Sequence, residues 1–228
     1  MLSWEGSAFY LRSTERISGL DEIIAWVTNN AGEDGCVIGI DAPIVIRNQT
    51  GMRDCDRLMH RDFGKYHAGA YPANLNLPHA RRPLELSQTL EKIGFSHGPG
   101  TMPRASGRSQ IEVHPHAAMV QLFALPQIIK YKKGRVAERR AELVRYRELM
   151  MARLPVLTPA CVLNDVIPEV PHTGPSMKNV EDRMDAIISA YVAAHWWYWG
   201  RERNEVCGEA EKGYIVVPNR VQPNSFQS

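Results

Sequence analysis

The segment Cys36-Val-Ile-Gly-Ile-Asp41-Ala-Pro43 places the strongest constraint on the fold of this chain. It is a short apolar run bounded by Gly35 and Pro43, which is typical of a buried strand in a parallel or mixed sheet. Asp41 follows at the carboxyl end of the strand, where open α/β sheets place ligands and catalytic groups. We therefore expect Asp41 to lie in a functional site, although Asp at such a position also caps turns.

Hydrophobic periodicity in the rest of the chain predicts an α/β fold. Strands are expected at residues 8–13, 36–41, 109–114 and 213–217. Helices are expected at residues 20–30, 53–63, 84–93, 117–125, 136–153 and 177–198, with irregular connections at 94–107 and 155–175. Nothing forces a split of the chain, so we expect one domain over residues 1–218 and a disordered polar tail over residues 219–228.

The composition excludes several classes of protein. No stretch approaches the roughly 20 apolar residues of a membrane span. The start of the chain lacks a basic segment followed by an apolar one, so we expect a cytoplasmic protein without a membrane partner. The four cysteines are far apart and form no Cys-x-x-Cys pair, which indicates free thiols rather than a zinc ribbon or disulfides. A net charge of +2 is too small to predict nucleic-acid binding from totals.

Acidic residues in three expected elements suggest a metal site. Asp41 ends one strand, Glu112 lies within another, and Asp182 and Asp185 lie three residues apart near the start of a late helix. Such a cluster of oxygen ligands suits Mg²⁺ or Mn²⁺, as in nucleases that use two metal ions. The alternatives are that Glu112 faces water at a sheet edge and that Asp182 stabilises the helix dipole.

Basic residues gather in two regions that could contact phosphate. Arg53, Arg57 and Arg61 are spaced four apart along one expected helix, opposite Cys55, Met59 and Phe63. Lys65 and His67 follow in a loop rich in hydrogen-bond donors, and a second basic stretch contains Lys132, Lys133 and Arg135. In both regions the alternative is an ordinary solvated helix face.

Several motifs together resemble an uncharacterised prokaryotic family of predicted nucleases with a ribonuclease H-like fold. The resemblance spans about residues 8 to 218. It rests on Val37-Ile-Gly-Ile-Asp-Ala-Pro43, Asn48-Gln-Thr-Gly-Met-Arg-Asp-Cys-Asp56, Tyr66-His-Ala-Gly-Ala-Tyr-Pro-Ala-Asn74, Ile111-Glu-Val-His-Pro-His116, Tyr131-Lys-Lys-Gly-Arg135, Glu181-Asp-x-x-Asp185-Ala and Gly213-Tyr-Ile-Val-Val-Pro218.

The resemblance implies a mixed β-sheet flanked by α-helices and a divalent-metal-dependent nuclease or phosphodiesterase activity. It assigns the metal-binding acids to Asp41, Glu112 and Asp185, with Asp182 as a second candidate. The phosphate contacts would come from Arg53, Arg57, Lys65, His67, Lys132, Lys133 and Arg135, and DNA or RNA would be the partner.

The chain departs from the resemblance at its start. Ribonuclease H-like folds open with a strand that carries a metal-binding acid, whereas only residues 1–7 precede the first expected strand here. Either the start is truncated or this member lacks that ligand. A missing neighbour would leave a bare edge strand, which favours pairing in a homodimer, and a missing ligand would weaken the nuclease.

Two other functions are compatible with the sequence. The first is a non-catalytic nucleic-acid-binding or scaffold protein on the same fold, with an incomplete metal site. The second is a zinc hydrolase that uses His114, His116 and either His60 or His67. Pro115 disfavours the second, because it interrupts the regular strand that would present the first two histidines on one face.

Overall fold

The computed structural model describes residues 1–32, 35–164 and 167–222. Its central element is a three-stranded parallel sheet in the order β3-β5-β4, formed by β3 (Cys36–Ile40), β5 (Arg108–Glu112) and β4 (Ser96–His97). In the register of β3 and β5, Ile40 is the partner of Glu112, so the two strands end together. The expected strand at residues 36–41 is thus confirmed, with Asp41 as the residue that follows it.

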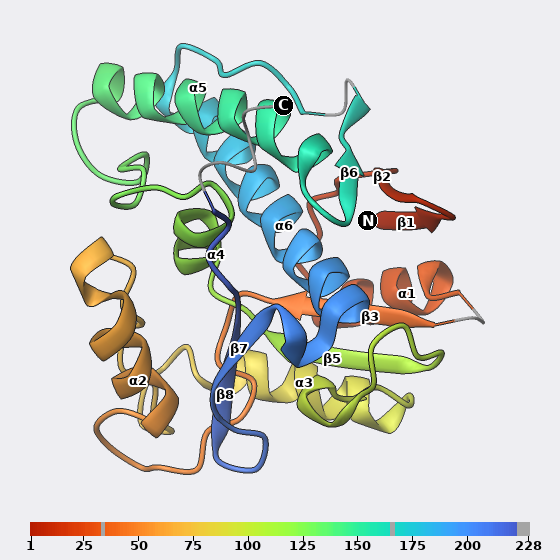
Figure 1. Cartoon of the computed structure of the whole chain (residues 1–228). Helices are drawn as coiled ribbons and strands as arrows, with labels where there is room; N and C mark the ends of the chain where they lie inside the picture. Colours follow the sequence, from red (N-terminus) through yellow and green to blue (C-terminus); the bar gives the residue numbers. More distant parts are fainter. Residues whose placement is uncertain (33–34, 165–166, 223–228) are drawn as a thin grey trace.

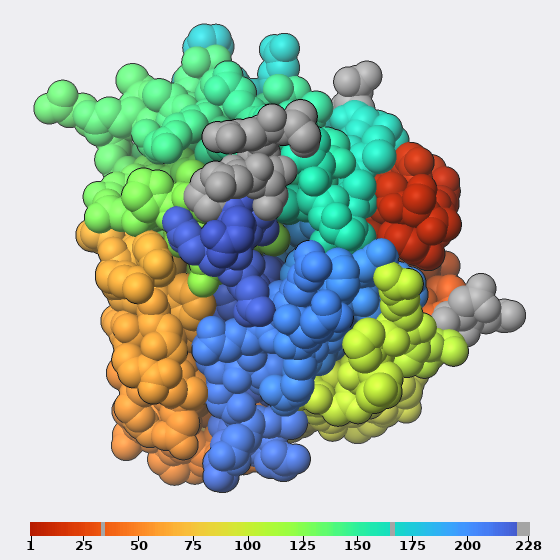
Figure 2. All heavy atoms as spheres, viewed as in Figure 1, coloured from red at the N-terminus to blue at the C-terminus, as the bar shows by residue number. Residues whose placement is uncertain are grey.

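Two further sheets complete the β structure of the described residues. The antiparallel hairpin of β7 (Asn204–Glu209) and β8 (Gly213–Pro218) contacts the end of β5 through a bridge between Val113 and Val216. The third sheet has the order β1-β2-β6, with β1 (Leu2–Glu5), β2 (Ala8–Leu11) and β6 (Ala160–Val162). Space filling shows the hairpin (blue) between α2 on the left and the yellow-green segment before β5 on the right (Figure 2).

The long helix α6 (Gly174–Trp199) crosses the middle of the molecule, with α5 above it and the β3–β5 sheet below it (Figure 1). It is buried on most of its surface, which explains its broadly apolar composition. The other helices are α1 (Leu20–Asn30), α2 (Asp54–Phe63), α3 (Arg81–Lys92), α4 (Pro115–Leu122) and α5 (Val136–Arg153), with the 3-10 helices η1 (Gly64–Tyr66), η2 (Gly98–Gly100), η3 (Leu154–Val156) and η5 (Gly200–Glu202).

The close packing of β3 on α6 depends on a glycine. A Cβ atom on Gly39 would overlap the backbone carbonyl oxygen of Ser189, so the strand and the helix touch backbone to backbone. Gly39 precedes Asp41 by two residues and Ser189 follows Asp185 by four, which is about one helical turn. This contact therefore brings the end of β3 close to the part of α6 that carries Asp185.

The observed fold confirms an α/β chain of small mixed sheets flanked by helices. It differs from the sequence expectation in four strands, because β1, β4, β6 and β7 were not expected. The strand β1 precedes the first expected strand and pairs with it in an antiparallel register. The strands β4 and β6 are two and three residues long, too short for a clear alternation of polar and apolar positions, and β1 and β7 contain no run of Val and Ile like that of β3.

Part of the expected disordered tail is ordered. Arg220 donates hydrogen bonds to the carbonyl oxygens of Val120 and Leu125, and Val221 donates its backbone N–H to that of Gln121. Residues 219–222 therefore lie along α4, whereas residues 223–228 lie outside the described residues. The four cysteines are free, as expected, and no helix in the described part of the chain is long and apolar enough to cross a membrane.

Candidate functional site

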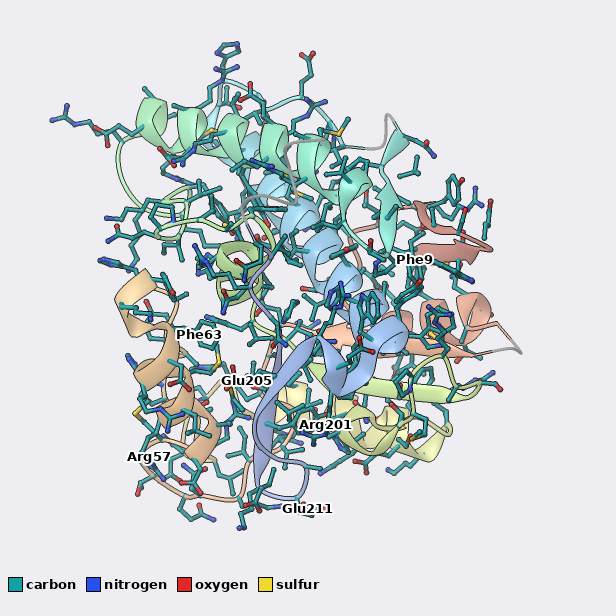
Figure 3. All side chains as sticks on the ribbon, in the orientation of Figure 1. Phe9, Arg57, Phe63, Arg201, Glu205 and Glu211 are labelled. Carbon is teal, nitrogen blue, oxygen red and sulfur yellow. The ribbon has the colours of Figure 1, made fainter. Side chains whose placement is uncertain are left out.

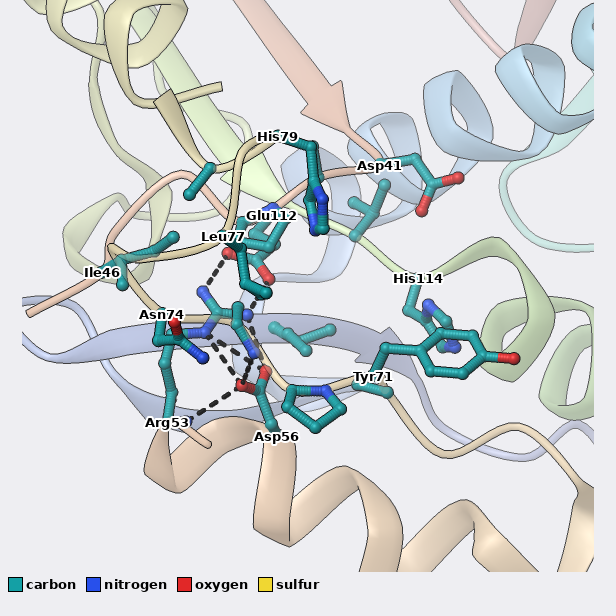
Figure 4. Close-up of a pocket in the computed structure, with 18 residues that line it drawn as sticks. Asp41, Ile46, Arg53, Asp56, Tyr71, Asn74, Leu77, His79, Glu112 and His114 are labelled. Atoms are coloured by element: carbon teal, nitrogen blue, oxygen red, sulfur yellow. Dashed lines mark hydrogen bonds and ion pairs between the residues drawn. The ribbon is translucent and has the colours of Figure 1, made fainter. Parts of the chain in front are cut away.

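Asp41 lies at the mouth of a pocket where β3 ends (Figure 4). Its side chain reaches solvent, but protein atoms surround it on its other sides. This loss of hydration, together with the negative charge of Asp185, raises the pKa of Asp41 to about 6, and the positive charge of Lys132 opposes the rise. The structure thus brings two of the predicted acids and one predicted cation into a single electrostatic cluster.

Asp185 is held in place by two residues that precede α5 and by one within it. The hydroxyl of Tyr131 donates a hydrogen bond to its Oδ1 over 2.5 Å, and Lys132 Nζ lies 2.8 Å from its Oδ2. The hydroxyl of Tyr146 lies 3.5 Å from Oδ1. Burial and the nearby acids raise the pKa values of both tyrosines, so both remain protonated and able to donate. Asp185 is consequently a fixed carboxylate rather than a mobile surface acid.

Glu112 does not join this cluster, because its carboxylate is occupied by Arg53. Arg53 Nη1 lies 2.8 Å from Oε2 and Nη2 lies 2.6 Å from Oε1, and the backbone N–H of Ile44 donates to Oε2 over 3.0 Å. Burial raises the pKa of Glu112 to about 7, and Arg53 opposes that rise. The short bidentate geometry is that of an ionised carboxylate, so we describe the two residues as an ion pair.

Arg53 also binds Asp56, which the sequence analysis did not select. Arg53 Nη2 lies 2.8 Å from Asp56 Oδ1, and Arg53 Nη1 donates to the carbonyl oxygen of Val45. Asp56 accepts backbone hydrogen bonds from Arg53 and Ala73. With 3% of its surface exposed, the predicted phosphate contact Arg53 is instead enclosed between two carboxylates (Figure 4).

Asp182 and Asp185 face different neighbours. Asp182 lies 2.7 Å from Lys178 at a partly exposed position on α6. Glu181, four residues before Asp185, is buried and contacts Lys178 and Arg139. Both acids are within one helical turn of Asp185, but only Glu181 is buried with it, whereas Asp182 is partly exposed.

The remaining predicted phosphate contacts are exposed. Arg57 lies on the outer side of α2 and pairs with Asp54 (Figure 3). Lys132 is exposed and, like the buried Arg53, contacts a predicted acid. The other exposed positions are Lys65, His67, Lys133 and Arg135.

His114 and His116 lie near the acidic cluster with buried Nε2 atoms that have no hydrogen-bond partner in the described chain. Their ring centroids are 5.9 Å apart, and the ring of His116 is 5.8 Å from that of Tyr131. Burial lowers the pKa of each histidine to about 4, so both are neutral at neutral pH. Within residues 1–32, 35–164 and 167–222, no group of three or more His, Cys, Asp or Glu side chains is arranged to hold a metal ion.

The pocket itself is a hollow of about 190 Å³ between the ends of β3 and β5 and the loop of residues 70–80. Asp41 and His114 line one side of it and the Arg53–Glu112–Asp56 group forms its buried floor (Figure 4). The sequence analysis identified this region through Asp41 and through the loop after α2. It missed Asp56, although an Arg and an Asp three apart at a helix start are a recognisable local pair. Tyr131 stands in a quoted motif but was given no role there, and no sequence pattern indicated Tyr146.

Comparison with known proteins gives a family but no function. Residues 2–211 match the family described as "Protein of unknown function (DUF429)". No curated protein matches the chain. No solved structure matches it either.

Proposed function

The chain belongs to the DUF429 family of proteins of unknown function, and we propose that it is a divalent-metal-dependent phosphodiesterase that acts on nucleic acid. The proposal rests on one observation. Asp41 directly follows β3 and Asp185 lies on α6, and these two elements touch backbone to backbone at Gly39 and Ser189, so that the charge of Asp185 raises the pKa of Asp41. Two mutually repelling carboxylates at the carboxyl end of a parallel sheet are a suitable arrangement for a divalent cation.

The residues present fit one ion better than the two-metal site expected from sequence. Mg²⁺ is usually bound by one or two carboxylates, with waters at the remaining positions, and Asp41 and Asp185 supply that number. Glu112 does not add a third, since its oxygens are held by the backbone of Ile44 and by a buried pair with Arg53, whereas the cation on Asp185, Lys132, is exposed and can yield its place to a metal ion. A bound Mg²⁺ or Mn²⁺ would supply charge neutralisation at the phosphate and a more acidic water.

Residues of the chain itself would hold and orient the substrate. Tyr131 fixes the orientation of Asp185 through the 2.5 Å hydrogen bond. Lys132, exposed beside Asp185, would contact a phosphate oxygen once a metal ion shares the aspartate. The exposed Lys133 would extend the basic surface along the nucleic-acid backbone.

A ribonuclease H-like fold is the architecture we infer for this activity. It is supported by the parallel pairing of β3 with β5, by the acid that ends β3 and by the packing of α6 on that strand. The proposal takes nucleic acid as the partner and the cytoplasm as the compartment. The strand expected to be a bare edge, β2, lies between β1 and β6, so a homodimer would instead pair two copies through β1, the edge strand of that sheet, which sedimentation would test.

Calorimetric titration of Mn²⁺ tests the metal site directly. The parent chain should bind Mn²⁺, and both Asp41→Asn and Asp185→Asn should abolish the binding. Asp182→Asn is the matched control, because Asp182 lies on the same helix but pairs with Lys178. Binding that survives both test substitutions would refute the assignment. Metal-dependent hydrolysis of bis(p-nitrophenyl) phosphate, lost in the same two variants, would then test the reaction.

A non-catalytic nucleic-acid-binding protein is the second candidate, and the occupied carboxylate of Glu112 favours it. This candidate predicts that Asp41→Asn leaves oligonucleotide affinity unchanged and that the parent chain hydrolyses no phosphodiester with Mn²⁺ present. The phosphodiesterase predicts loss of hydrolysis in the same variant.

A further inference from the structure

The pocket beside Asp41 has an apolar wall that does not belong to the main hydrophobic core. Ile46, Ala73 and Ala80 form a separate small cluster with Leu77 and Leu84 packed against it. Four of these five residues, all except Leu84, also line the pocket. The side chains of this wall therefore present apolar surface to the hollow, which is typical of a ligand pocket.

The polar groups on the floor of the pocket are already satisfied. Arg53 donates to both Asp56 and Glu112, and each of the three is at most 3% exposed. A ligand in this hollow therefore gains apolar contact more than new hydrogen bonds. The volume of about 190 Å³ is below the roughly 300–1,000 Å³ of pockets for drug-sized ligands, so the hollow accommodates a single small ring system.

Tyr71 stands at the rim of this hollow with 80% of its surface exposed, the largest exposure among the large hydrophobic residues in the described chain. Its side chain makes no hydrogen bond and no ring contact with residues 1–32, 35–164 or 167–222. Figure 4 shows its ring near the His114 side of the opening, with Asp41 on the same side of the pocket. An aromatic face is thus open to solvent beside the proposed metal-binding acid.

We propose that this pocket binds one base of a single-stranded nucleic acid, with the ring of Tyr71 stacking on that base or on its neighbour. This inference rests on the proposed function, because it places the base next to the phosphate held near Asp41. Aromatic side chains stack on every base without regard to sequence. Bases in a duplex are paired and stacked and do not reach such a pocket, so the substrate class is single-stranded DNA or RNA.

Fluorescence anisotropy tests the inference without any metal ion. A short labelled single-stranded oligonucleotide is titrated with the parent chain, Tyr71→Ala and Tyr71→Phe, all in EDTA. Tyr71→Ala should weaken binding by about 5- to 150-fold, the range that loss of one stacked base gives, and Tyr71→Phe should bind like the parent. Met102→Ala is the matched control, since Met102 is 76% exposed and lies outside the pocket lining.

Parent-like affinity of Tyr71→Ala, or equal affinity of the parent for the same sequence as a duplex, would overturn the inference. Its failure is separable from that of the proposed function. If the parent chain binds Mn²⁺ and hydrolyses bis(p-nitrophenyl) phosphate, but Tyr71→Ala binds the oligonucleotide like the parent, the base pocket alone is contradicted. If Tyr71→Ala weakens oligonucleotide binding but the parent chain binds no Mn²⁺, the phosphodiesterase is contradicted and the base pocket is supported.

Discussion

Arg53 and Glu112, 59 positions apart in the chain, form a bidentate ion pair with N–O distances of 2.6 and 2.8 Å. Arg53 immediately precedes α2 and Glu112 is the last residue of β5. Because both side chains are almost fully buried, the pair fixes the start of the helix against the end of the strand. The floor of the candidate pocket is therefore a structural link between two elements.

Glu112→Gln should lower the free energy of unfolding by about 3–5 kcal/mol, because it leaves the guanidinium of Arg53 buried with one charge partner fewer. Urea denaturation measures the loss. Asp54→Asn is the control, since Asp54 forms an exposed pair with Arg57 on the same helix, and exposed pairs contribute about 1 kcal/mol or less. Similar losses in the two variants would contradict the buried pair.

Tyr131→Phe should destabilise the protein by about 1.5–3 kcal/mol, the usual contribution of a hydrogen bond to a charged group. The variant removes the 2.5 Å hydrogen bond to Asp185 and keeps the ring that stacks on Tyr146. Tyr146→Phe should cost less, because its hydroxyl lies 3.5 Å from the same oxygen. The reverse order in urea denaturation would show that Tyr146, and not Tyr131, positions the aspartate.

Lys132→Met should tighten Mn²⁺ binding by up to about fivefold, because the ammonium group competes with the metal ion for Asp185. The same variant should weaken oligonucleotide binding and reduce the slope of log affinity against log salt by about one, as expected for one phosphate contact. Calorimetry and anisotropy at several salt concentrations measure the two effects. Lys133→Met is the neighbouring control and should leave Mn²⁺ affinity unchanged. Weaker Mn²⁺ binding by Lys132→Met would mean that Lys132 does not compete for Asp185.

Asp41→Asn should stabilise the protein at neutral pH. The pKa of about 6 in the folded chain exceeds the roughly 3.9 of an unfolded Asp. The folded state therefore binds more protons between these two values, and the parent gains stability as pH falls from about 6 to about 4. Because Asp41 is exposed to water, we expect Asp41→Asn to raise the free energy of unfolding by only about 1 kcal/mol, or Tm by about 2–4 °C. Thermal melts at several pH values should show the difference shrink toward pH 4, and a difference independent of pH would refute the assignment.

Residue patterns within single segments predicted the elements whose position those patterns determine. The strand that ends at Asp41 is marked by a run of Val and Ile between Gly35 and Pro43, and the structure places it at Cys36–Ile40. The predicted burial of Cys55, Met59 and Phe63 on one face of α2 is also confirmed, because the helical period fixes that face.

The sequence could not reveal contacts between distant segments. Spacing alone placed Arg53 on an exposed stripe, but the fold encloses it between Glu112 and Asp56. Spacing also left Asp182 and Asp185 as equal candidates, and only the packing of α6 shows that Asp185 contacts Tyr131 whereas Asp182 pairs with Lys178. Pairing of this kind depends on tertiary structure, which no single-sequence pattern contains.

Any side chain at Gly39 would overlap the backbone of α6, and this limits which features of the site substitutions can change. The contact between the two backbones sets the spacing of the elements that carry Asp41 and Asp185, whereas Tyr131 and Lys132 orient the Asp185 side chain. Substitutions at Tyr71 or His114, which line the pocket, can therefore alter the preferred substrate while the packing of β3 on α6 is kept. In this architecture the geometry of the acids and the selectivity of the pocket are able to vary independently.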